Sequence, residues 1–244
     1  GDAGPRLEQP VTQQWKTGVI IRAIGGPCAG LSGTFPVPLD WPEQQVKLAD
    51  QSATPHFQRV SYRTTEEVLK QALFTIPLVQ GGDIARMELT FDVVNYVQIA
   101  PTNTSGYAIP KSVATNMRKY LAPSPYIEST NLKVKNLTKE AVADKETAWE
   151  QIESIYNLVR EKVTYERTSN GRFVGAVGAI SNGKADREDL TGLFVAACRV
   201  HKIPSRMVWV PDSCYAEFYL EDAGEKGYWF PAQLVGDKQF GGLE

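Results

Sequence analysis

Residues 183–206 read GKADREDLTGLFVAACRVHKIPSR and give the clearest indication of the fold. Asp186 is a residue type that caps helix N-termini, and Asp189 follows three positions later, much as in a capping box. Mostly apolar residues then recur at spacings of three and four, which indicates one buried helix face. They are Leu190, Phe194, Ala197, Cys198 and His201. The pattern predicts a helix over Arg187–Val200 and, after it, a strand over Ser205–Val210.

A longer helix precedes this stretch and two further strands follow it. The helix begins at about Lys139 or Asp144 and ends at Lys162, and apolar residues lie at helical spacing along one face. These residues are Trp149, Ile152, Ile155, Tyr156, Val159 and Val163. The strands are predicted over residues 214–220 and 228–231. A helix followed by antiparallel strands predicts an α+β fold rather than alternating βαβ units.

The first part of the chain contains strand patterns separated by many turn residues. The strand candidates are residues 11–24, 33–39, 72–77 and 83–99. In the last of them apolar residues alternate with mostly polar ones, as expected for a sheet with one buried face and one wet face. The apolar set is Met87, Leu89, Phe91 and Val93. Together these patterns predict a small antiparallel β-sandwich.

These patterns divide the chain into three parts. Residues 1–10 are polar and have no hydrophobic period, so we expect a flexible lead. Residues 11–105 form the predicted β-sandwich domain and residues 106–244 the α+β domain, with a polar linker close to the boundary. A polar start of this kind commonly follows a removed export signal. We therefore expect an exported protein, either periplasmic or extracellular.

The composition excludes several classes of function. Apolar residues make up 42% and charged residues 22%, with a formal net charge of -2. Because the basic residues are scattered, we expect no nucleic-acid partner. No apolar run is long enough for a transmembrane segment. With three cysteines, two histidines and no C-x-x-C motif, we expect neither a zinc site nor any other cofactor.

Several motifs of the second half resemble the transglutaminase-like superfamily, whose members have a papain-like fold. The resemblance extends over about residues 140–235 and follows the family's order of elements. The motifs are residues 183–190, residues 193–199, Ile203-Pro204-Ser205-Arg206, the strand with Tyr215, Glu217 and Tyr219, and Gly227-Tyr228-Trp229-Phe230-Pro231. Residues 35–46 resemble the β-domain that often precedes bacterial transglutaminase-like domains. The resemblance implies a β-sandwich followed by a papain-like α+β domain.

The resemblance also implies where the family's catalytic residues would lie, and all three are replaced. Arg187 matches the cysteine, Ser213 the histidine and Gln233 the aspartate. The family's chemistry needs a thiolate and an imidazole, whereas a guanidinium has no lone pair to offer and a serine hydroxyl is no base near neutral pH. We therefore interpret the chain as a catalytically inactive member, a pseudoenzyme that binds protein or peptide. The residues expected at its binding site are Arg187, Asp189, Tyr215, Glu217 and Trp229.

Three questions stay open at this stage. Arg187 either binds a carboxylate or phosphate in the old groove or, as we favour, pairs with a nearby acidic residue and plugs it. The candidate acidic residues are Asp186, Glu188, Asp189 and Glu217. Strand alternation places Cys214 among core residues, but a register slip would leave a rewired cysteine hydrolase or acyltransferase that uses Cys214 or Cys28. A purely structural exported module, with a filled groove, is the third possibility.

Overall fold

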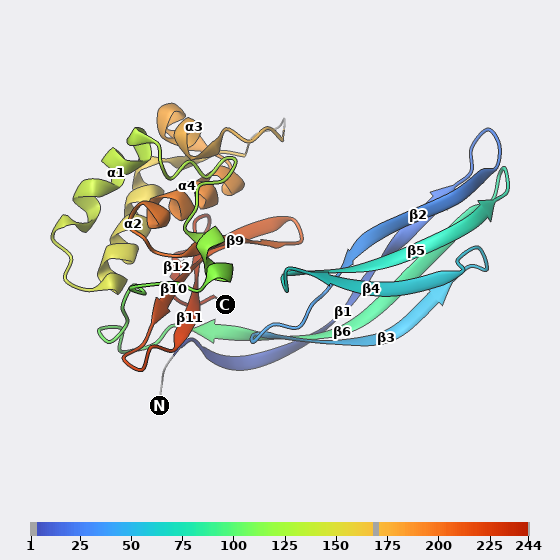
Figure 1. Ribbon diagram of the computed structural model, residues 1–244, viewed down its shortest axis with the longest axis horizontal. Coiled ribbons are helices and arrows are strands. Elements are labelled where there is room, and N and C mark those ends of the chain that lie inside the picture. Colours follow the sequence, from blue (N-terminus) through green and yellow to red (C-terminus); the bar gives the residue numbers. More distant parts are fainter. Residues whose placement is uncertain (1–3, 168–170, 244) are drawn as a thin grey trace. The chain divides into compact units, whose positions relative to one another are not determined.

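The computed structural model describes residues 4–167 and 171–243, which fall into two compact units. The N-terminal unit consists of Glu8–Val97. The C-terminal unit begins at Gln98 and also includes the described residues ahead of Glu8. The division therefore precedes the polar linker that we predicted between the two domains. Figure 1 shows both units and labels α1–α4 and the longer strands.

The N-terminal unit contains two antiparallel three-stranded sheets. The first has the strand order β1–β6–β3, with bounds Arg6–Arg22, Ile84–Ile99 and Gln44–Ala53. The second has the order β2–β5–β4, with bounds Cys28–Val37, Leu69–Val79 and Arg59–Thr65. Strand β1 begins inside residues 1–10, so part of the expected flexible lead is regular structure.

Side chains from both sheets form one hydrophobic cluster in this unit. The four apolar residues predicted for the buried face of β6 are all buried. The second sheet supplies Phe35 and Phe74, whose ring centroids lie 6.3 Å apart, and Ile76. Because two sheets share one core, the antiparallel β region is confirmed as a two-layer structure.

The C-terminal unit contains four α-helices and a four-stranded sheet among its described residues. The helices are α1 (Leu132–Ala143), α2 (Ala148–Lys162), α3 (Gly175–Asn182) and α4 (Arg187–Val200). The sheet has the order β12–β11–β10–β9, with bounds Gln239–Phe240, Gly227–Gln233, Ser213–Glu221 and Ser205–Val210. Shorter elements are the 3-10 helix η1 (Thr115–Tyr120) and the parallel pair β7 (Thr164–Tyr165) and β8 (Lys184–Ala185). The predicted α+β fold is confirmed.

Helix α2 begins where its sequence permits a reciprocal cap. The Thr147 hydroxyl accepts a hydrogen bond from the Glu150 backbone N–H, and the Glu150 carboxylate accepts one from the Thr147 N–H. This capping box satisfies two N–H groups that would otherwise lack a partner in the helix. The predicted apolar face of α2 is buried along its whole length.

Helix α4 has the predicted bounds and is the centre of the C-terminal unit. It contacts α1, α2, α3, β9 and β10, and most of its residues are buried. The Asp186 carboxylate accepts a hydrogen bond from the Asp189 backbone N–H at 3.1 Å, as the capping pattern indicated. The packing on all sides fixes the direction of α4 and therefore the position of its first residue, Arg187.

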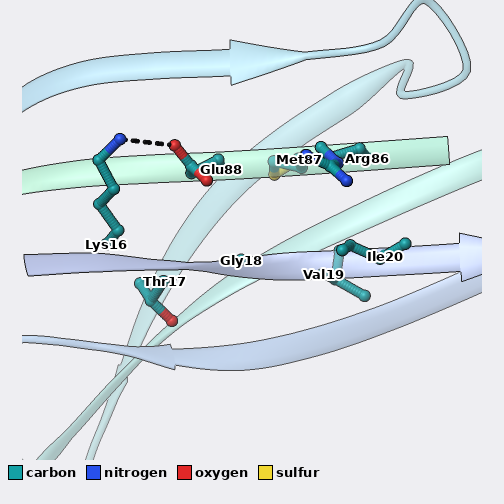
Figure 2. Close-up of a pocket in the computed structure, with 8 residues that line it drawn as sticks. All are labelled: Lys16, Thr17, Gly18, Val19, Ile20, Arg86, Met87 and Glu88. Carbon is teal, nitrogen blue, oxygen red and sulfur yellow. Dashed lines mark hydrogen bonds and ion pairs between the residues drawn. The ribbon is translucent and has the colours of Figure 1, made fainter.

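The N-terminal unit has a hollow of about 210 Å³ where β1 lies beside β6. Lys16 and Glu88, two of the residues that line it, form an ion pair of 3.1 Å (Figure 2). A Cβ atom on Gly18 would lie 2.0 Å from the Met87 carbonyl oxygen, so only glycine permits this close approach of two strands. Its lining residues belong to β1 and β6, and Lys16, Arg86 and Glu88 are the charged ones among them.

Candidate functional site

Arg187 is the first residue of α4, at the position that the resemblance assigns to the catalytic cysteine. Its guanidinium lies over the Tyr165 ring, 5.9 Å from the centroid, and is half-buried. Within residues 4–167 and 171–243, no carboxylate forms an ion pair with Arg187. The predicted pairing with a neighbouring acidic residue is therefore not found in this part of the chain, and the guanidinium keeps its hydrogen-bonding capacity.

The Asp189 carboxylate accepts hydrogen bonds from backbone N–H groups of the same chain. It accepts hydrogen bonds from the Val174 N–H at 3.0 Å and the Gly175 N–H at 2.8 Å. Burial raises the pKa of Asp189, and the two backbone hydrogen bonds oppose that shift by favouring the charged form. The residue thus fastens the segment ahead of α3 to the first turn of α4. We had expected Asp189 at a binding site, and its position in the structure gives it this anchoring role.

Cys214 points from β10 toward α4. Its side chain is 2% exposed, and its thiol donates a hydrogen bond to the Thr191 hydroxyl, with 3.6 Å between sulfur and oxygen. Burial raises the pKa of Cys214 to about 11. Charge effects from Arg187 and Asp186 also reach the thiol, so it lies near the start of α4. The prediction of a core thiol is confirmed, and Cys198, also predicted as a packing residue, is fully buried with a strongly raised pKa.

The opposite face of the sheet holds three of the residues that we predicted for ligand binding. The Glu217 carboxylate forms an ion pair with Arg206 at 2.6 Å. The Arg206 guanidinium in turn lies over the Trp229 ring, 4.2 Å from its centroid. Tyr120 of η1 packs edge-on against Trp229, and Tyr215 is buried. This face is therefore filled by side chains rather than open as an aromatic cleft.

The three positions that the resemblance assigned to the catalytic residues lie on α4, β10 and β11. Strand alternation puts Ser213 and Gln233 on the same sheet face as Glu217, whereas Arg187 lies on the side of α4. No hydrogen bond or ion pair joins these three side chains in the described part of the chain. The assignment of the replaced triad stays a prediction.

Sequence patterns gave no sign of an exposed aromatic row in this unit. Tyr126, Phe173 and Trp209 are exposed by 52%, 43% and 60%. The ring centroids of Tyr126 and Phe173 lie 5.4 Å apart, and those of Phe173 and Trp209 6.4 Å apart. The three residues come from distant parts of the sequence, so no local period or motif could have connected them.

The described residues offer no cluster of His, Cys, Asp and Glu side chains that could hold a metal ion. No helix in the same part of the chain combines the length and the apolar character that crossing a bilayer requires.

Comparison with known proteins places this geometry in a structural class. Residues 135–234 match the model of the transglutaminase-like superfamily. The chain thus contains a transglutaminase-like domain, preceded by an N-terminal β region. A solved structure from Cytophaga hutchinsonii, described as a "putative cysteine protease", is similar with a TM-score of 0.64 and 16% identity, covering 94% of this chain and 78% of that one.

A second solved structure, from Parabacteroides distasonis and described as a "putative protease", has a TM-score of 0.34 and 10% identity. The match covers 92% of this chain and 47% of that one. No curated protein matches the sequence. At 16% identity the likeness to the Cytophaga hutchinsonii structure shows the fold and not the activity.

Proposed function

We propose that the chain is a catalytically inactive transglutaminase-like protein, a pseudoenzyme whose C-terminal unit binds protein or peptide. The observation that carries the proposal is the first turn of α4. The helix begins with the permanently charged Arg187, and the thiol near it, that of Cys214, is buried with a raised pKa. A buried thiol of high pKa supplies almost no thiolate near neutral pH.

The position of the histidines supports the same proposal. The C-terminal unit has one histidine, His201, which follows the last residue of α4. A helix of this length separates it from Arg187 by about 20 Å, at 1.5 Å of rise per residue. An imidazole at that distance cannot take a proton from a nucleophile at the start of the helix. Within the described residues of this unit, His201 therefore lies too far from Arg187 to serve a nucleophile at the start of α4.

The test is an acyl-transfer and hydrolysis assay on the native protein. We expect no incorporation of a fluorescent primary amine into a glutamine-rich protein, with or without calcium, and no cleavage of peptide amides. An active transglutaminase serves as the positive control. Trapping a thioester on this chain, or activity that disappears on Cys214→Ser substitution, would refute the proposal.

A rewired cysteine hydrolase or acyltransferase is the second candidate, because one observation favours it. Cys214 faces α4 within range of Arg187, so a thiol does lie close to the place that the family uses for catalysis. Its partner is the Thr191 hydroxyl, which is no general base near neutral pH. The Cys214→Ser variant in the same assay separates the two candidates.

A further inference from the structure

The exposed aromatic row Tyr126–Phe173–Trp209 lies beside the first two turns of α4. Asp189 of the first turn holds Val174 and Gly175, the residues that follow Phe173. Trp209 lies directly opposite Cys214 in the register of β9 with β10, and Cys214 contacts Thr191 one turn after Arg187. Neighbouring strand residues that face each other share one side of the sheet. The row and Arg187 therefore border the same start of α4.

Exposed aromatic rings in contact with one another are unusual on a protein surface without a partner. Tyrosine and tryptophan are also the residue types that dominate binding energies at protein interfaces. The separations of 5.4 and 6.4 Å between successive rings are close to the repeat of an extended chain. In a strand, side chains on the same side recur about every 6.5 to 7 Å. An extended peptide could therefore place alternate side chains on successive rings.

Strand β9 offers hydrogen-bonding groups next to the row. It is an edge strand of its sheet, with β10 as its neighbour. The Tyr219 N–H donates a hydrogen bond to the Pro204 carbonyl. In an antiparallel pair the backbone groups of every second residue point toward the partner strand, so from Pro204 onward those of Arg206 and Val208 point toward β10. The backbone groups of Met207 and Trp209 consequently point away from β10. Arg199 binds the Ser205 carbonyl on that same outer side, which supports the direction.

Arg187 supplies charge complementarity. Its guanidinium has no carboxylate partner within the described residues, and it is half-buried against Tyr165. Arginine binds carboxylates through two parallel hydrogen bonds, which gives direction as well as attraction. A ligand with an acidic side chain would satisfy this group.

We propose that the start of α4, the aromatic row and the outer edge of β9 together bind an extended peptide that combines an acidic side chain with alternating aromatic residues or prolines. This inference rests on the proposed binding function and specifies its ligand. The peptide adds to β9 as a further strand, its ring-bearing side chains lie on Tyr126, Phe173 and Trp209, and its carboxylate reaches Arg187.

The experiment measures fluorescence anisotropy of a short capped peptide with tyrosines at alternating positions and one glutamate. Two matched probes replace the glutamate by glutamine or all tyrosines by serine. We expect Trp209→Ala to weaken binding of the first probe about tenfold, the loss typical of an aromatic anchor. Arg187→Gln should weaken the glutamate probe several-fold and leave the glutamine probe unchanged. High salt should remove the effect of Arg187.

Matched controls use side chains of the same kind elsewhere. Ile24→Ala removes an apolar side chain that is 88% exposed in the N-terminal unit, and Lys139→Gln removes an exposed cation of α1. Both should bind like the unmodified protein. Phe173→Ser provides a second test of the row should Trp209→Ala fold poorly, which circular dichroism would reveal.

Two outcomes overturn the inference. If the unmodified protein binds the probes but the Trp209 and Arg187 variants bind equally well, the site lies elsewhere and the proposed binding function survives. If the unmodified protein binds none of the three probes, the ligand class is wrong. Neither result bears on catalytic activity. The proposal of an inactive protein is tested separately, by the acyl-transfer and hydrolysis assay.

Discussion

Arg206 and Glu217 face each other across β9 and β10, with Nε and Oε2 2.6 Å apart. Their side chains are only 19% and 5% exposed, and Trp229 lies against the guanidinium. The pair thus fills the sheet face turned away from α4. An ion pair of this kind is strongly interdependent, because removing one partner leaves the other charge buried without compensation.

Substituting Glu217 should therefore destabilise the protein. We expect Glu217→Gln to lower the free energy of unfolding by about 3 kcal/mol, the low end for breaking a buried pair. The control is Glu166→Gln in the exposed pair of Lys184 with Glu166, which should cost about 0–1 kcal/mol. Denaturant titration followed by circular dichroism measures both. Equal effects of the two substitutions would show that the Arg206 pair is solvated rather than buried.

The second prediction concerns the pH dependence that His201 confers. Burial lowers the pKa of His201, whose Nε2 lies 2.9 Å from the Thr138 hydroxyl oxygen. The unfolded state, with a pKa near 6.5, then binds the proton more readily than the folded state. The contribution of neutral His201 to stability is present above about pH 6.5 and is lost as the pH falls toward the lowered pKa.

His201→Gln should remove that part of the pH dependence. We expect the variant and the unmodified protein to differ in the slope of unfolding free energy against pH between about pH 7 and about pH 5. Denaturant titrations at several pH values supply the slopes. Parallel slopes would mean that His201 titrates alike in the folded and unfolded states.

Elements with a strong hydrophobic period could be predicted from the sequence, whereas those with a weak period, such as α3, β3 and β4, could not. Helix α4 and strand β9 have the predicted bounds, because a capping residue and a proline mark their limits. Strands β3 and β4 were missed because they are mostly exposed and show little alternation. Strand β3 forms by pairing with β6, and β4 by pairing with β5. Such pairing partners cannot be recognised from a local sequence pattern.

Only those parts of the candidate site that depend on local sequence patterns could be predicted. The start of α4 follows from local signals, so Arg187 was placed correctly at the first helical position. The aromatic row could not be predicted, because only tertiary packing brings Tyr126 and Phe173 next to Trp209 and the three residues are far apart in the sequence. The roles of Asp189 and Glu217 were also hidden, since their partners Gly175 and Arg206 lie 14 and 11 residues away.

The third prediction tests the close approach of β1 to β6 shown in Figure 2. An added methyl group at Gly18 would lie 2.0 Å from the Met87 carbonyl oxygen, so the strands would have to separate. We expect Gly18→Ala to cost about 1–3 kcal/mol, as overpacking typically does. Hydrogen exchange should show faster exchange in β1 and β6. Gly106→Ala, where a new methyl would meet no atom within 4 Å, is the control and should be neutral.

The last prediction asks which thiols of the chain can react. Cys198 and Cys214 are buried, whereas Cys28 is half-exposed. In a Cys28→Ser variant, a brief pulse of iodoacetamide should therefore modify no cysteine in the native state. Adding Arg187→Cys should restore labelling, because a thiol at a helix N-terminus has a lowered pKa and this position is partly exposed.

Mass spectrometry after the pulse identifies the modified residue in each variant. Labelling of the introduced thiol alone would mean that the start of α4 still favours a thiolate. The unmodified protein would then be unreactive there because it has no cysteine at position 187. Rapid labelling of Cys214 in the Cys28→Ser variant would contradict its burial. That result would favour the rewired thiol enzyme over the pseudoenzyme, since the buried state of Cys214 is the main physical objection to it.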